Sequence, residues 1–197
     1  MPEAAMPPCG SSHVLKLVIN SHVAYNVPLR TLLISLLHSG FDRYGDVLLM
    51  LGGSPQDALP ALTPISELLP GLASEHRRVV VVRTRNNGFD YHGLSLLYQH
   101  RGHPLVAADT YVYFHDTTTV DPDTFVERFE AFRLKRSPLL FTTWPLPNSN
   151  IVAFGAGVVH KYGNNFDGNL TKVEAFPMEF GYPQKVVSAS GPVFVGS

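Results

Sequence analysis

The chain has 197 residues, of which 45% are hydrophobic and 16% are charged, so it can bury one sizeable core and form one domain. Its formal net charge of −1, without any run of like charges, argues against a nucleic acid or an anionic membrane as the main partner. The single Cys9 excludes an intramolecular disulfide, and the sequence shows no signal peptide and no apolar stretch of ~18 residues that would span a membrane. We therefore expect a cytoplasmic protein, with a flexible N-terminus over residues 1–13 and a single domain over residues 14–197.

Strand-like and helix-like patterns alternate along the first two thirds of the chain. Short runs rich in Val, Leu and Ile predict buried strands over residues 14–20, 46–51, 78–83 and 110–115. We expect helices over residues 28–38, 90–100 and 123–135. Leucines recur at helical spacing in the first two, and the third begins with proline and aspartate and ends with basic residues. The segment over residues 54–76 is punctuated by proline, which predicts short helical turns.

This alternation predicts an α/β fold, a three-layer sandwich with a mainly parallel central sheet and helices on both sides. Residues 137–197 have a different character, with strand-like pieces joined by Gly, Asn and Pro. They predict a mixed or antiparallel C-terminal extension of the same domain, without a long helix.

Polar side chains follow three of the expected strands at their carboxyl ends. They are Ser21 and His22 after the first strand, Arg85, Asn86 and Asn87 after the third, and His115, Asp116 and Thr117 after the fourth. In open α/β sheets, ligands bind beyond the carboxyl ends of the strands, near the point where the strand order reverses. The fold alone therefore predicts a ligand site at these residues.

Three segments resemble the nucleotide-sugar-binding half of GT-A fold glycosyltransferases of the family-2 type. They are "VLKLVINSHVAYNVPLRTLLISLLHSG", "VVVVRTRNNGFDYHGLSLLYQHR" and "DTYVYFHDTTTVDPDTF". The resemblance implies a GT-A-like, Rossmann-like domain in which residues 14–136 bind the nucleotide sugar and residues 137–197 face the acceptor. It further implies transfer of a sugar from a UDP- or GDP-sugar to a hydroxyl group of a glycan or another acceptor.

The resemblance also implies which residues contact the donor. The implied nucleotide-sugar-binding residues are Ser21, His22, Arg85, Asn86, Asn87, Asp90, His115 and Asp116. Structural alternatives stay open, because a backbone carbonyl at the first strand end serves a nucleobase equally well. The loop before the second expected helix suits a phosphate or a ribose, but it also suits a turn at Gly88 with asparagine or Asp90 capping the helix.

The family's acidic signature, Asp-x-Asp, is altered here to His115-Asp116-Thr117. In the family these carboxylates hold Mn²⁺ or Mg²⁺, which neutralises the diphosphate of the donor. Asp116 retains one oxygen ligand of the kind that hard divalent ions prefer, and His115 is acceptable to Mn²⁺ but poor for Mg²⁺. The resemblance thus implies a Mn²⁺ or Mg²⁺ site at Asp116 and His115, and the alternative is that these two residues form a hydrogen-bonded pair that closes the strand.

An inverting transfer needs a carboxylate to take the proton from the acceptor hydroxyl, and in the family it comes from the second half. The candidates are Asp167, Glu174 and Glu179. Glu174 and Glu179 flank the apolar "AFPM", whereas Asp167 lies in "NNFDGN", which turn chemistry explains more simply.

Two other classes of protein stay open. The altered signature is compatible with an inactive GT-A-like domain that binds a nucleotide or a glycan. The same strand-end site suits another α/β enzyme, such as a nucleotidyltransferase or a hydrolase. The sequence contains no G-x-S-x-G elbow, no Walker-type loop and no G-x-G-x-x-G after a strand, which disfavours several common alternatives.

Overall fold

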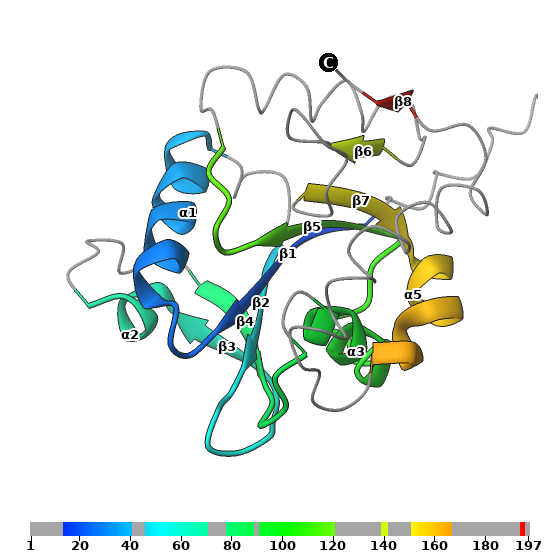
Figure 1. Cartoon of the computed structure of the whole chain (residues 1–197), viewed down its shortest axis with the longest axis horizontal. Coiled ribbons are helices and arrows are strands. Elements are labelled where there is room, and N and C mark those ends of the chain that lie inside the picture. The colour runs from blue at the N-terminus through cyan, green and yellow to red at the C-terminus, as the bar shows by residue number, and fades with distance from the viewer. Residues whose placement is uncertain are drawn as a thin grey trace, which may run out of the picture.

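A computed structural model describes residues 14–40, 46–70, 78–88, 91–120, 139–141, 151–166 and 194–195. Its strands are β1 (Leu15–His22), β2 (Asp46–Gly52), β3 (Ala58–Pro64), β4 (Arg78–Arg83), β5 (Thr110–His115), β6 (Leu139–Phe141), β7 (Ile151–Gly155) and β8 (Phe194–Val195). Its helices are α1 (Asn26–His38), α2 (Ile65–Leu68), α3 (His92–Gln99) and α5 (Ala156–Tyr162), and the 3-10 helix η3 (Gly163–Phe166) follows α5 (Figure 1). The expected helix over residues 123–135 and the N-terminus over residues 1–13 lie outside the described residues.

All eight strands belong to one sheet, in the order β3-β4-β2-β1-β5-β7-β6-β8. The central strands β4, β2, β1 and β5 are parallel to one another. They coincide with the strands that the sequence predicts, because each is an apolar run that can be buried on both faces. The expectation of an α/β fold with a mostly parallel sheet is therefore confirmed.

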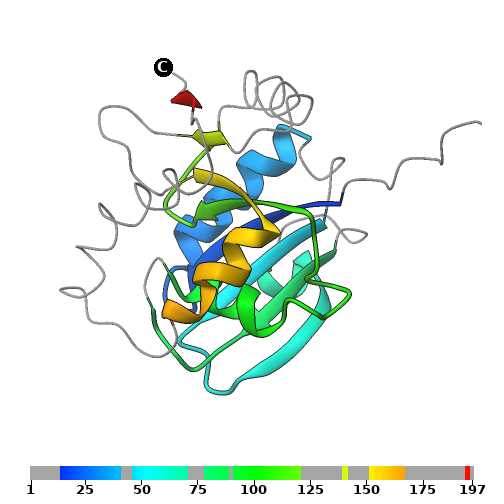
Figure 2. The same ribbon diagram turned by 90° about the vertical axis from the view of Figure 1, so that its right-hand side faces the viewer.

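The order of the central strands reverses at β1. From β1 the chain passes through α1 to β2 and then to β4, and it returns through α3 to β5 on the other side of β1. Parallel crossovers are right-handed, so progressions in opposite directions put their helices on opposite faces of the sheet. Accordingly, α1 and α2 cover one face, while α3 and α5 cover the other (Figures 1 and 2).

Each face of the sheet has its own apolar core. On the α1 face, Leu17 and Ile19 of β1 and Phe114 of β5 pack in one cluster with the leucines of α1. On the α3 face, the alternate residues of the same strands, among them Val18 and Tyr113, pack with the leucines of α3. This alternation follows from the two-residue period of a strand, and it fixes the face on which each polar residue at a strand end lies.

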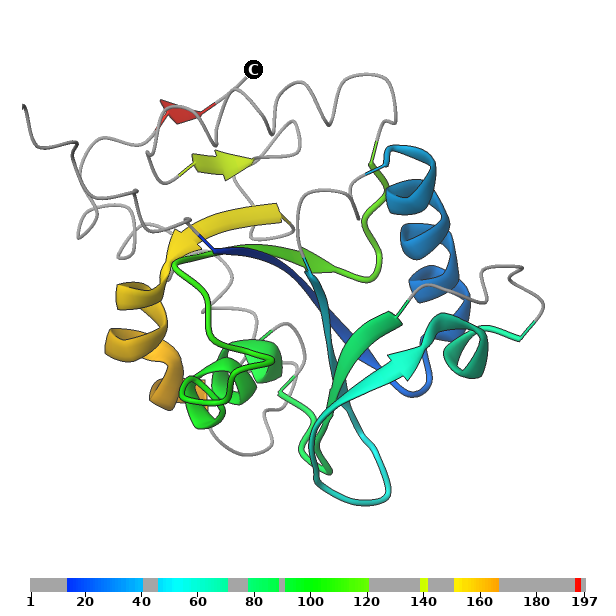
Figure 3. The same ribbon diagram turned by 180° about the vertical axis from the view of Figure 1, so that it is seen from behind.

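Outside the central strands the sheet is mixed. Strand β3 is antiparallel to β4 at one edge, β7 is antiparallel to β5 and to β6, and β8 is parallel to β6 (Figure 3). This agrees with the mixed extension that the sequence predicts for the last third of the chain.

Two elements differ from the expectations. Residues 58–64 form strand β3, where the sequence predicted short helical turns, and only α2 fits that prediction. Pro60 and Pro64 are tolerated because an edge strand has its sheet partner on one side only. The short helix α5 was also not expected, since glycine and valine are poor helix formers, but Val159 is buried in the core on the α3 face and holds the helix there.

No helix among the described residues is long and apolar enough to cross a lipid bilayer.

Candidate functional site

The parallel strands place their carboxyl ends at one edge of the sheet, and the order reverses between β1 and β5. In open α/β sheets this point is where ligands bind. The three polar clusters that the sequence singles out lie at the carboxyl ends of β1 and β5 and in the loop after β4, so the structure brings them to one edge.

Ser21 and Asp116 form a hydrogen-bonded pair at this point. The Ser21 hydroxyl donates to Oδ2 of Asp116 at 2.7 Å, and the two residues are only 2% and 7% exposed. The backbone N–H of Asp116 also donates to the Asn20 carbonyl at 3.1 Å, which extends the pairing of β5 with β1 by one residue. One hydrogen bond from Ser21 therefore holds the Asp116 carboxylate and a second one, donated by the Asp116 N–H, holds its backbone to β1, so the carboxylate is not a loosely held group on an open surface.

His115 lies on the other face of the sheet. Its ring packs edge-on against the ring of Tyr113, with centroids 5.7 Å apart, and Tyr113 belongs to the core on the α3 face. Asp116 bonds to Ser21, whose place in the alternation of β1 is on the α1 face. This alternation places the two side chains on opposite faces, which favours neither a His115–Asp116 side-chain pair nor one cation shared by both side chains.

A buried network links the Ser21–Asp116 pair to the start of α3. Nε2 of His92 lies 2.8 Å from the Ser21 carbonyl oxygen and 3.2 Å from that of Met50. Both partners can only accept, so Nε2 carries the hydrogen and donates. The backbone N–H of Gly93 donates to Oδ1 of Asn20 at 2.8 Å. We call Asn20, Ser21, His92, Gly93 and Asp116 the switch-point cluster.

The cluster changes the interpretation of the α3 N-terminus. From the sequence, the loop before this helix suits a phosphate or a ribose. Its Gly93 N–H is instead hydrogen-bonded by the Asn20 side chain, which satisfies a donor that the first turn of a helix leaves open. A phosphate group of a nucleotide sugar therefore gains no hydrogen bond from the Gly93 N–H in this arrangement.

His22 and Asn86 meet at the loop after β2. Nδ1 of His22 accepts a hydrogen bond from the Ala24 N–H at 3.1 Å, and a Cβ at Gly53 would overlap the His22 ring. Gly53 has φ +68°, a conformation that glycine adopts without strain, and its N–H donates to the Asn86 carbonyl at 3.2 Å. The half-buried His22 and Asn86 thus lie on either side of Gly53, although 64 positions separate them in the sequence (86 − 22).

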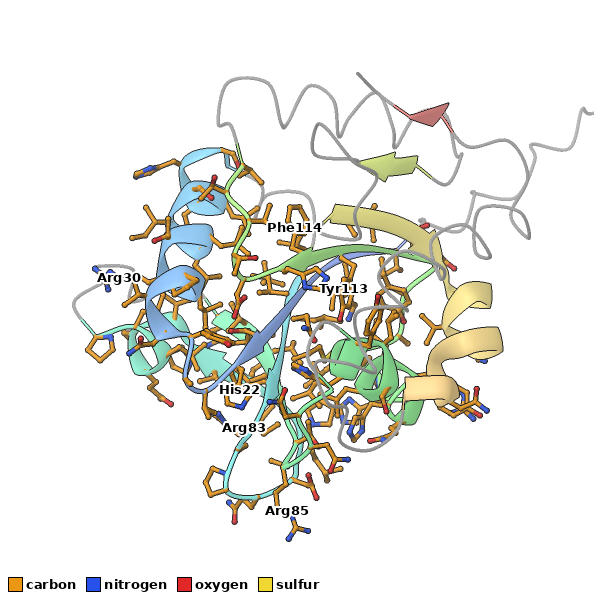
Figure 4. The ribbon with its side chains drawn as sticks, viewed as in Figure 1. His22, Arg30, Arg83, Arg85, Tyr113 and Phe114 are labelled. Atoms are coloured by element: carbon orange, nitrogen blue, oxygen red, sulfur yellow. The ribbon has the colours of Figure 1, made fainter. Side chains whose placement is uncertain are left out.

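Arg85 points outward and is bound to Asp57. The Arg85 backbone N–H donates to Oδ1 of Asp57 at 2.8 Å, and its guanidinium lies 3.3 Å from Oδ2. The N–H of Arg85, the hydroxyl of Thr84 and the guanidinium of Arg85 together lower the pKa of Asp57. In Figure 4, Arg85 lies at the outer end of its loop, so it can reach a ligand only at the rim of the site.

The remaining predicted residues divide into two groups. Asn87 is half-buried next to Asn86 and belongs to the same edge. Asp90 and the candidate bases Asp167, Glu174 and Glu179 lie outside the described residues. Among the described residues, no group of three or more His, Cys, Asp or Glu side chains could hold a metal ion by itself.

Three residues of this site, Asn20, Asp57 and His92, were not predicted from the sequence. Asn20 ends the strand expected over residues 14–20, and His92 lies in the helix expected over residues 90–100, but neither was among the predicted site residues. Asp57 lay in the segment for which helical turns were expected. One sequence pattern could have identified Asn20: it is a polar residue at a position of β1 that faces a buried core.

The fold is similar to that of a solved protein. Rv0371c from Mycobacterium tuberculosis H37Rv has the same overall arrangement in two crystal structures, one of them a complex with manganese. The TM-score is 0.54 for both, with 16% sequence identity to the manganese complex and 17% to the other structure. The match covers 95% of this chain and 91% of that chain, and at this identity it supports the fold alone. No protein-family model and no curated protein matches the chain.

Proposed function

We propose that the protein is a glycosyltransferase that transfers a sugar from a UDP- or GDP-sugar to an acceptor hydroxyl. The observation that supports this most is the Asp116 carboxylate, which β1 and Ser21 hold at the point where the strand order reverses. Open α/β sheets bind nucleotides at this point, and the resemblance to GT-A glycosyltransferases adds the sugar.

The donor lies across the carboxyl ends of the parallel strands. We place the base and ribose against His22, Asn86 and Asn87, because these half-buried groups offer hydrogen-bond donors and acceptors beside the glycine loop after β2. We place the diphosphate toward Asp116, on the α1 face of β5. Arg85 meets the donor only at the rim, because its side chain is 69% exposed and paired with Asp57.

A divalent cation fits this site only as a partner of the substrate. Mg²⁺ is usually bound through one or two carboxylates together with substrate phosphates and water, and we assume the same for Mn²⁺. Asp116 supplies one carboxylate, and one of its oxygens accepts the hydrogen bond from Ser21. Such a cation would neutralise the charge of the diphosphate leaving group. That Rv0371c was crystallised with manganese agrees with this part of the proposal.

His115 is then a neighbour of the cation site rather than a ligand on the same face. The general base stays proposed among Asp167, Glu174 and Glu179, and the location that we propose is the cytoplasm. A second candidate, a domain that binds a nucleotide sugar without turning it over, is favoured by the single carboxylate that remains of the family's Asp-x-Asp signature.

A product assay separates these functions. The protein is incubated with UDP- or GDP-sugars, Mn²⁺ and a panel of hydroxyl acceptors, and the released nucleoside diphosphate is measured. Release that depends on an acceptor is the expected result, whereas binding without release identifies the inactive domain. Release of pyrophosphate from a nucleoside triphosphate would identify a nucleotidyltransferase. If the protein neither binds nor converts any of these compounds, the proposal is wrong.

The matched control for the site is a second carboxylate that is changed to an amide. Glu67 is exposed on α2, which begins directly after β3. The end of β3 pairs with the start of β4, so Glu67 lies near the amino ends of the parallel strands, opposite to the carboxyl ends that carry the site. Glu67→Gln changes the net charge as Asp116→Asn does, and it should leave product release unchanged.

A further inference from the structure

We infer that His92 is a positioning residue for Asp116 and that it acts through Ser21. This rests on the proposed function in one respect, that Asp116 helps to bind the diphosphate of the nucleotide sugar. His92 does not bond to Asp116 in the hydrogen bonds described above; it lies on the α3 face, and it reaches the Ser21–Asp116 pair through the main chain of β1.

His92 joins the ends of two parallel strands. Its Nε2–H lies between the carbonyl oxygens of Ser21 on β1 and Met50 on β2, at 2.8 and 3.2 Å. The imidazole is 3% exposed, so these bonds are shielded from competing water. The His92 side chain thereby adds to the pairing of β1 with β2, in which Ser21 is the partner of Leu51, in holding the peptide unit that carries the Ser21 carbonyl.

Ser21 transmits this constraint to the other face of the sheet. Its carbonyl is held by His92, and its hydroxyl donates to Oδ2 of Asp116 at 2.7 Å. A rotation of the Ser21 backbone that breaks the first bond also moves the hydroxyl away from the carboxylate. The position of the Asp116 oxygen atoms therefore depends on the hydrogen that Nε2 of His92 donates.

The surroundings of His92 are shaped to hold an imidazole. A Cβ at Gly52 would lie 3.0 Å from both Cε1 and Nε2 of His92, and a Cβ at Gly88 would lie 3.0 Å from its backbone nitrogen. Gly52 at the end of β2 thus leaves room for the His92 ring, and Gly88 after β4 leaves room for the His92 backbone. The room at Gly52 is an observation separate from the hydrogen bonds, and it supports a specific role for the ring.

A double-mutant cycle tests the inference. His92→Met removes the donor and keeps an apolar side chain, His92→Gln offers an N–H donor again, and Ser21→Ala removes the hydroxyl. Leu97→Ala is the control, because Leu97 is fully buried on the same helix but belongs to the apolar core on the α3 face. Affinity for a UDP-sugar with Mn²⁺ is measured by calorimetry, and stability is measured separately by denaturant unfolding.

His92→Met should weaken binding by about 10-fold in the presence of Ser21, as is common when a residue that supports a metal ligand is lost. It should weaken binding little further in the Ser21→Ala background, because the path to Asp116 is already broken. His92→Gln should restore most of the affinity, and Leu97→Ala should lower stability without this loss. If His92→Met lowers the affinity equally with Ser21 and with Ser21→Ala, the role of His92 is merely structural and the inference is wrong.

Two measurements without a nucleotide keep the inference separate from the proposed function. In the wild-type protein, ¹⁵N NMR should find the His92 hydrogen on Nε2, and an Nε2 without hydrogen would overturn the inference even if His92→Met did not fold. Hydrogen exchange of the Asp116 amide should be faster in His92→Met and unchanged in Leu97→Ala. If these results hold while the wild type binds no nucleotide sugar, only the proposed function fails.

Discussion

Replacing Gly93 by alanine should destabilise the protein, although alanine is the better helix former. Gly93 is the second residue of α3, and its N–H is bonded to the Asn20 side chain. A Cβ at this position would lie 2.6 Å from the Tyr113 hydroxyl oxygen and 2.8 Å from Oδ1 of Asn20. Both distances are shorter than a carbon atom allows, so the helix start or both side chains must move.

The magnitude follows from three contributions. Alanine gains up to about 1 kcal/mol over glycine within a helix. Overpacking of a filled core costs about 1–3 kcal/mol, and loss of the buried hydrogen bond between Gly93 and Asn20 costs about 1–3 kcal/mol. The costs exceed the gain, and we expect a net loss of about 3 kcal/mol in the free energy of unfolding.

Denaturant unfolding measures this loss as a lower midpoint at an unchanged slope. Gly157→Ala is the matched control, because Gly157 is an exposed helical glycine of α5 with nothing within 4 Å of the added Cβ. The control should be as stable as the wild type or more stable by up to about 1 kcal/mol. A Gly93→Ala protein that is as stable as this control would refute the close approach of α3, β1 and β5 on which the switch-point cluster depends.

Two further predictions concern pH. The bonds from Arg85 and Thr84 lower the pKa of Asp57 below 3.8, so their contribution to the order of this loop should be fully present above that pH and be lost as the pH falls below it. The amide NMR shift of Arg85 should follow this loss, and Asp57→Asn should abolish the titration. Burial and the neighbouring His103 lower the pKa of His100 below 6.5, so the fold favours the neutral imidazole. Unfolding free energy should therefore decrease as the pH falls below 6.5, and an equally steep decrease in His100→Gln would contradict this assignment.

The sequence predicted those parts of the fold that depend on local patterns. Runs such as "VVVV" in β4 and "YVYF" in β5 are typical of buried strands because they are rich in β-branched and aromatic residues, and their alternation with helices predicts a parallel sheet. Strand β3 was missed because its prolines are compatible with an edge position that only the neighbouring strand defines. Helix α5 was missed because its stability comes from packing and not from propensity.

The site was predictable as a location but not as a set of contacts. The carboxyl ends of parallel strands must meet, so Ser21, Asn86 and Asp116 could be assigned to one edge. The partner of Asp116 could not be read from the sequence, because Ser21 reaches it across 95 positions. That the side chains of His115 and Asp116 face opposite sides of the sheet could have been predicted, since successive residues of a strand do so. The role of His92 required the three-dimensional register of β1, β2 and α3.

Calorimetry of wild-type and Asp116→Asn protein with UDP- and GDP-sugars, with and without Mn²⁺, is the decisive experiment on the proposed role of Asp116. We predict that the wild type binds one of these donors and that Mn²⁺ strengthens the binding. Asp116→Asn should lose about 10-fold or more in affinity with Mn²⁺, as expected when a charged ligand is lost. Its melting temperature should change little, because the asparagine carbonyl can still accept the hydrogen bond from Ser21. Unchanged nucleotide-sugar affinity in an Asp116→Asn protein that has lost stability would contradict the account and assign Asp116 to the fold alone.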